Sequence, residues 1–179
     1  TNNTGQGAAY IFKRSLQENP DFTANSTLHT DYTSKYGWSS NSGWEVSAKD
    51  VYTPISGTRE PWVAFSKSNS SYLDHWLSNS APSTSSPQWI QIKYPSAQVI
   101  KSYMIRARED SSNIRFPTAW KLQGSVSDGT TWVDIGSEQT QTTWTGNTTK
   151  TFDVSSNTTA YQYYRLRITT TIRGASTPS

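Results

Sequence analysis

The sequence predicts an all-β fold, an antiparallel sandwich or barrel. After residue 43, apolar and polar residues alternate in short segments, which is the period of a half-buried strand. Ser and Thr account for 28 and 25 of the 179 residues, and such residues favour strand faces and turns over helix interiors. Loops rich in Ser, Pro and Gly separate the segments, and no amphipathic helix pattern occurs.

The strongest strand signal is the segment 117–135, which reads as a β-hairpin. Apolar residues alternate with polar ones up to residue 126, so we expect one face to be buried. Asp128-Gly129 suits the positive backbone φ angle that tight hairpin turns require. The residues expected on the buried face are Trp120, Leu122, Gly124, Val126, Val133 and Ile135.

The remaining elements follow from the same alternation. Eight Trp residues supply much of the apolar area, because each large ring buries roughly 150–250 Å². Five of them are expected in the core: Trp44, Trp62, Trp89, Trp120 and Trp132. Strands are expected within 44–48, 89–94, 103–107, 152–154 and 164–168, with shorter apolar segments at 62–65 and near Trp76.

Residues 1–42 differ from the rest of the chain and predict an N-terminal arm or linker, with the sandwich in residues 43–179. Residues 8–12 form one short apolar segment, and the polar stretch that follows lacks a clear period. An alternative is that residues 8–12 add a strand to the sandwich or to a neighbouring subunit. The chain begins with Thr1, so we expect a processed product or a piece of a longer polypeptide.

Several motifs resemble the discoidin-type domain, the C-type module of coagulation factors and of galactose-binding-like lectins. The segment 117–132, P-T-A-W-K-L-Q-G-S-V-S-D-G-T-T-W, resembles the central hairpin of that family. The resemblance covers about residues 43–170 in the same order and implies an antiparallel jelly-roll β-sandwich of about eight strands. The other matching segments are Trp44–Ala48, Trp62–Phe65, Trp76–Ser78, Pro87–Ile92, Ile100–Arg106, Thr143–Phe152 and Ala160–Thr169.

Two departures from the family pattern are visible. Ser66-Lys67 replaces an Asp-Gly pair that, in carbohydrate-binding members, helps to hold a structural calcium. A hydroxyl and a cation suit a cation with six to eight oxygen ligands poorly, so calcium is disfavoured although Asp74 could contribute, and no metal or cofactor is expected. The strand that usually closes the family fold is also missing after residue 170. Because an unpaired sheet edge promotes aggregation, we expect residues 8–12 or a neighbouring subunit to replace it.

The chain contains few groups suited to catalysis, so the sequence predicts a protein that is not an enzyme. Cys is absent, and the two His residues, His29 and His75, accompany no nucleophile motif. The acidic pair Glu109-Asp110 is explained as a solvated loop. The basic residues are scattered, which disfavours a nucleic-acid partner. The sequence contains no apolar run of 18 residues, so membrane insertion is not expected.

Sugar binding is better supported, because aromatic rings and planar polar groups on loops suit the faces and hydroxyls of sugars. The resemblance implies a site in loops at one end of the sandwich, and residues 53–60, 66–76, 108–116 and 138–147 are the candidate loops. Each candidate also has a structural alternative, because Phe116 could pack in the core and Trp144 is as able to pack as to bind. The predicted ligand-binding residues are Tyr72, Arg108, Asn113, Arg115, Phe116 and Trp144.

The sequence therefore predicts a non-catalytic adhesion module that recognises cell-surface glycans outside the cell. Isolated lectin sites are weak, so such a module usually acts as one copy among several. The alternative is a structural or decoration subunit of a large assembly, such as a virus or phage particle, located at the virion surface. In that case the fold serves protein packing or receptor binding on a host.

Overall fold

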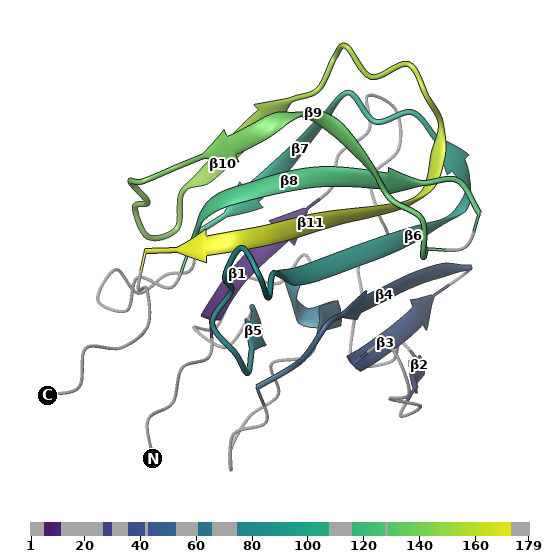
Figure 1. Cartoon of the computed structure of the whole chain (residues 1–179). Coiled ribbons are helices and arrows are strands. Elements are labelled where there is room, and N and C mark those ends of the chain that lie inside the picture. Colours follow the sequence, from purple (N-terminus) through teal and green to yellow (C-terminus); the bar gives the residue numbers. More distant parts are fainter. Residues whose placement is uncertain are drawn as a thin grey trace, which may run out of the picture.

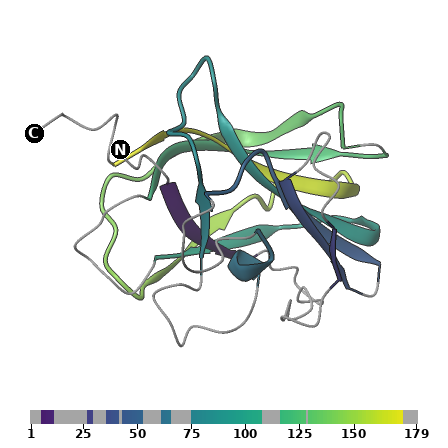
Figure 2. The same ribbon diagram turned by 90° about the horizontal axis from the view of Figure 1, so that it is seen from below.

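The computed structural model describes residues 6–11, 27–29, 36–41, 43–52, 61–65, 75–107, 116–127 and 129–172. In this part of the chain the strands form two sheets that face each other (Figures 1 and 2). Every strand pairing described is antiparallel. The predicted all-β sandwich is thus confirmed.

Seven strands form the larger sheet. In spatial order they are β2 (Thr27–His29), β3 (Tyr36–Asn41), β4 (Trp44–Ala48), β6 (Gln88–Gln98), β11 (Tyr161–Thr171), β8 (Pro117–Ser125) and β9 (Val133–Thr140). The opposite sheet contains β10 (Thr149–Asp153), β7 (Ser102–Arg106), β1 (Gln6–Ile11) and β5 (Trp76–Ser78). The short apolar segment at 62–65 forms a 3-10 helix, η1 (Pro61–Phe65).

The core lies between the two sheets and is rich in aromatic rings. Trp120 of β8 is fully buried, and its indole N–H donates a 2.9 Å hydrogen bond to the hydroxyl of Tyr103 on β7. The ring of Phe152 from β10 meets Trp120 edge-on, with centroids 5.0 Å apart. Both sheets therefore contribute to one aromatic cluster. Aliphatic residues from β4, β6, β8, β11 and β7 complete it: Val46, Ala48, Ile90, Ile92, Leu122, Leu166, Ile168 and Ile105.

Residues 1–42 contribute three described strands instead of the single strand that the sequence predicts. β1 lies between β7 and β5, with Ala9 opposite Arg106 and Gly7 opposite Leu77. β2 and β3 extend the larger sheet beside β4. β1 therefore adds a strand to the sandwich, which is one of the alternatives predicted for residues 8–12. The prediction of an arm or linker is therefore corrected for β1, β2 and β3, because the backbone of β1 pairs in the smaller sheet and that of β2 and β3 in the larger one.

The end of the β8–β9 hairpin also differs from the prediction. Val126 is 61% exposed and Val133 is 52% exposed, although the alternation predicts that both are buried. β8 ends at Ser125, so Val126 already belongs to the turn. Trp132 is half-buried outside the core, and Trp62 and Trp89 are half-buried as well, whereas Trp44 and Trp120 are core residues as predicted.

Gly124 is required because a neighbouring ring occupies the space of a side chain. A Cβ atom at this position would lie 2.5 Å from the Cγ and Cδ2 atoms of Tyr161. Tyr161 in turn meets Tyr164 edge-on, with ring centroids 5.8 Å apart. The glycine of the L-Q-G-S motif thus leaves room for the ring of Tyr161, at the start of β11, to lie against β8.

We predict that Gly124→Ala lowers the free energy of unfolding by about 1–3 kcal/mol, because overpacking a well-packed site forces rings or backbone to move. Urea unfolding followed by tryptophan fluorescence measures this loss. The double variant Gly124→Ala/Tyr161→Leu should lose less stability than the two single variants together. Strict additivity would show that the ring of Tyr161 is not the obstacle.

Candidate functional site

The segments that follow β7 and β9 meet the segments that precede β10 and begin β8 at one end of the sandwich. The backbone N–H of Ala107, just after β7, donates to the carbonyl oxygen of Thr148 at 2.8 Å. The N–H of Gln141, just after β9, donates to the carbonyl oxygen of Thr118 on β8 at 3.0 Å. We call residues 106–107, 116–118 and 140–150 the Trp144 end.

Trp144 is the half-buried aromatic residue at this end. Its indole N–H donates a 2.9 Å hydrogen bond to the carbonyl oxygen of Pro117. The ring packs beside Phe116 and Trp120, with centroid separations of 5.6 and 6.3 Å. The Nζ atom of Lys150 lies 5.6 Å from the ring centroid, within the range of a cation–π contact. The ring is therefore held in one orientation while part of it stays accessible.

A guanidinium and an amide lie at the same end. The Nη2 atom of Arg106, at the end of β7, donates to the side-chain oxygen of Asn147 at 2.9 Å. Asn147 is exposed and has a φ of 61°, which suits the tight turn that begins at Thr145. An aromatic ring, an ammonium, a guanidinium and an amide thus come together. Such groups can stack on the C–H face of a sugar and hydrogen-bond its hydroxyls.

Only part of the predicted site lies within the described residues. Phe116 is 2% exposed, because it packs into the core beside Trp144, so its prediction as a ligand contact is corrected. Trp144 is half-exposed at the expected end. Asn147 and Lys150 were not among the predicted ligand-binding residues, although Gly146-Asn147 is a turn signal that places a polar side chain at the surface. The positions outside the described residues are Tyr72, Arg108, Asn113 and Arg115.

Of the candidate loops, 53–60 lies wholly outside the described residues. Within 66–76, the structure describes His75 and Trp76, and both are buried, which does not favour contact of either with a large ligand. In the described ranges no group of three or more His, Asp or Glu side chains is placed to hold a metal ion. The residues relevant to the calcium expectation, Ser66, Lys67 and Asp74, lie outside those ranges.

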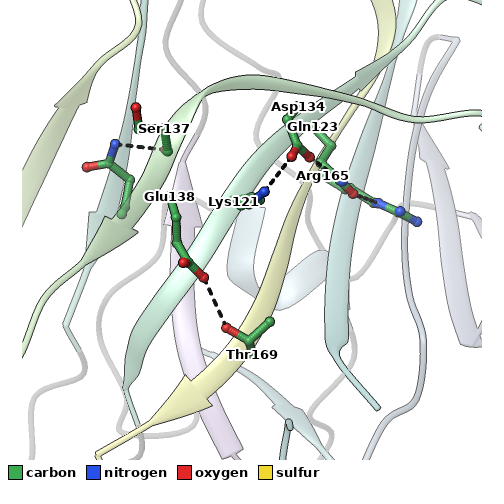
Figure 3. Close-up of polar contacts among 8 residues, drawn as sticks. Lys121, Gln123, Asp134, Ser137, Glu138, Arg165 and Thr169 are labelled. Carbon is green, nitrogen blue, oxygen red and sulfur yellow. Dashed lines mark hydrogen bonds and ion pairs between the residues drawn. The ribbon is translucent and has the colours of Figure 1, made fainter. Parts of the chain in front are cut away.

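A second polar cluster lies on the outer face of the larger sheet (Figure 3). The Nζ atom of Lys121 donates to Asp134 at 2.6 Å, and the side-chain amide of Gln123 donates to the same carboxylate at 2.6 Å. The Nε–H of Arg165 donates to the Oε1 atom of Gln123 at 2.7 Å. The Arg165 guanidinium lies 4.0 Å from the ring centroid of Trp132. We call these five residues the outer-face cluster.

The electrostatics of this cluster follow from its hydrogen bonds and its burial. The Lys121 ammonium, and then the Gln123 amide, hold the pKa of Asp134 below its ordinary value. Burial lowers the pKa of Arg165 to about 10, and the positive charge of Arg167 acts in the same direction. Both groups nevertheless stay charged at neutral pH. Lys93 forms a separate ion pair with Glu45 at 2.7 Å on the same face, which raises the pKa of Lys93.

We predict that Asp134→Asn destabilises the protein at neutral pH by a few tenths to about 1 kcal/mol, since the pair with Lys121 is partly exposed. A lowered carboxyl pKa stabilises the fold above the ordinary value of 3.8, and this stabilisation is lost as the pH falls through the folded-state pKa. Urea unfolding at about pH 7 and about pH 2.5 should show the difference between variant and parent shrinking in acid. In a Lys121→Gln background, Asp134→Asn should cost less; an unchanged cost would exclude the ion pair as its source.

No helix in the described part of the chain is long and apolar enough to span a membrane. The chain matches no curated protein sequence.

Comparison with solved structures gives several proteins of the same fold. A Clostridium perfringens module named CpGH89CBM32-5, in complex with GalNAc-beta-1,3-galactose, is 16% identical with a TM-score of 0.57 over 73% of this chain and 86% of that chain. An F5/8 type C domain from Bacteroides fragilis is 10% identical with a TM-score of 0.55 over 82% and 87% of the two chains. Chitosan-binding module 2 from Paenibacillus sp. IK-5, in complex with chitotriose, is 22% identical with a TM-score of 0.50 over 72% and 85%.

The family model of the F5/8 type C domain matches residues 19–178, which is most of the chain. The match begins before residue 43, in agreement with the pairing of β2 and β3 in the larger sheet. It also confirms the resemblance to the discoidin-type domain that the motifs indicate. The chain belongs to the F5/8 type C domain family.

Proposed function

We propose that this protein is a non-catalytic module that binds cell-surface glycans at the Trp144 end. The observation that supports the proposal is the half-buried ring of Trp144, fixed by its hydrogen bond to Pro117 and flanked by Lys150. A fixed ring loses little conformational freedom when a sugar stacks on it, which favours binding. The solved relatives that bind saccharides have the same fold and support the same function.

Polar groups around the ring give the proposed site its hydrogen-bonding capacity. Asn147 and Arg106 supply an amide and a guanidinium, and their mutual hydrogen bond holds them ready for a ligand. Arg108 follows Ala107 directly in the chain, and Arg115 precedes Phe116, so the loop that joins these points starts and ends at the Trp144 end. We therefore keep Arg108, Asn113 and Arg115 in the proposed site.

A single sugar site on one domain binds weakly, and avidity between several copies would make adhesion to a glycan surface stronger. The proposed setting is the outside of a cell, where glycans are displayed. The alternative is a subunit of a large virus or phage assembly. Pairing of residues 8–12 with another chain would favour that alternative, but β1 pairs with β5 and β7 of its own chain.

We predict that the protein, multimerised on beads, binds selectively to a subset of glycans on an array. Asn147→Gly should reduce this binding at least about tenfold, since it removes an amide that hydrogen-bonds sugar hydroxyls. Glycine tolerates the positive φ of Asn147, so the turn should keep its shape. Lys150→Gln, which removes the cation beside Trp144, should also weaken binding.

Lys101→Gln is the matched control. Lys101 precedes the start of β7, at the end of that strand opposite Arg106, and donates to the carbonyl oxygens of Ser155 and Asn157. This variant changes the net charge as Lys150→Gln does, and it should leave glycan binding unchanged. Binding of no glycan by a folded, multimerised protein would refute the proposal and favour the assembly role.

A further inference from the structure

The outer face of the larger sheet carries two neighbouring arginines on one strand. Arg165 and Arg167 are two residues apart on β11, so their side chains leave the same face of the sheet. Arg165 is paired in register with Gln91 and Gln123, and Arg167 with Trp89 and Lys121. Cations from β8 and β11 and the ring of Trp89 from β6 are thus adjacent.

Positive charge exceeds negative charge at this place. Lys121, Arg165 and Arg167 lie near two carboxylates of β9: Asp134, which accepts hydrogen bonds from Lys121 and Gln123, and Glu138, which accepts a 3.5 Å hydrogen bond from Thr169 of β11 (Figure 3). The charges of both Lys121 and Arg167 act on Asp134, and Arg167 also acts on Arg165. Among the described residues of this face, Glu45 is already paired with Lys93. Three cations against Asp134 and Glu138 leave an excess of one positive charge, and like charges at neighbouring positions cost stability.

One of the two guanidinium groups is already fixed in place. Arg165 is stacked 4.0 Å from the ring centroid of Trp132, and its Nε–H is bound to Gln123. Within the described part of the chain, it makes no other hydrogen bond, so its terminal N–H groups remain for a ligand. A held guanidinium is suited to bind a planar or tetrahedral oxyanion through two parallel hydrogen bonds.

Trp89 gives this surface an apolar component. It is half-buried on the outward face beside Arg167, while its neighbour Ile90 points into the core. Its indole N–H donates to no acceptor among the described residues. The Nζ atom of Lys49 is bound nearby, to Ser86 and to the carbonyl oxygen of Pro87. An accessible ring beside two guanidinium groups is the pairing that an anionic sugar would use, with the ring under its C–H face.

We propose that Arg165, Arg167, Lys121 and Trp89 form a second site, which binds the carboxylate or sulfate group of an acidic saccharide. The arginines and the lysine contact the oxyanion, and Trp89 contacts the sugar ring. This site lies on the side of the larger sheet, whereas the Trp144 end lies at the ends of the strands. It therefore does not depend on the function proposed for Trp144.

Calorimetric titration of the whole chain at low salt tests this proposal with three probes of equal length. The probes are a sulfated oligosaccharide, an oligouronate and a neutral oligosaccharide. We expect saturable binding of at least one acidic probe, quenching of tryptophan fluorescence, and loss of affinity as salt is added. The stronger of the two acidic probes identifies the preferred oxyanion. No saturable binding of either acidic probe would overturn the proposal.

Arg167→Gln should lower the affinity for the acidic probe about tenfold or more, because hydrogen bonds between charged partners are the strong ones. Trp89→Leu should weaken it as well. Lys101→Gln, which removes the same charge from another part of the molecule, should have no effect. Thermal unfolding of each variant confirms that it is folded.

An equal loss in Lys101→Gln, or equal affinity for a DNA strand of the same charge, would show general polyanion attraction and overturn the proposal. The Asn147→Gly variant should keep the acidic site intact. The two sites can therefore fail independently in these experiments.

Discussion

The hydrogen bond between Trp120 and Tyr103 joins the two sheets at the centre of the core. Trp120 comes from the larger sheet and Tyr103 from the smaller one, and both side chains are almost fully buried. A buried indole N–H without a partner would cost about 1–3 kcal/mol, so this pairing fixes how the sheets face each other. The same burial raises the pKa of the Tyr103 hydroxyl, which therefore stays protonated at any physiological pH. Trp144 rests on the side of this cluster, so the orientation of the proposed sugar site also depends on it.

The two faces of the larger sheet have different chemistry for the same geometric reason. Alternate residues of β8 and β11 point inwards as apolar side chains and outwards as amides and cations. On the outer face, hydrogen bonds link Lys121, Asp134, Gln123 and Arg165 into one chain (Figure 3). Gln91 and Gln123 are buried although they lie on this outward face, because long neighbouring side chains can cover them. The outer face is therefore partly covered by its own long side chains.

Much of the core could be predicted from sequence, because a period of two places residues such as Trp120, Leu122 and Leu166 on one face. Val126 could not, since its exposure depends on β8 ending at Ser125, and alternation does not locate strand ends. Phe116 could not be assigned either, because a ring beside a proline can point to a loop or to the core. β2 and β3 were missed because Thr27–His29 is only three residues long and the alternation in Tyr36–Asn41 stops after Trp38, and pairing with β4 is a tertiary effect. The outward arginines follow from the alternation, but the charge excess around them needed the register of three strands.

The place of β11 has a consequence for the order in which the fold can be completed. This strand lies in the middle of the larger sheet, between β6 and β8, yet it is the last strand of the described chain (Figure 1). During synthesis on the ribosome, β6 and β8 are made first and would expose unpaired edges until β11 emerges. Exposed edges promote association with other chains, so a nascent chain that stalls before residue 161 would be prone to aggregate. The four-stranded sheet, whose strands all precede residue 154, faces no such delay.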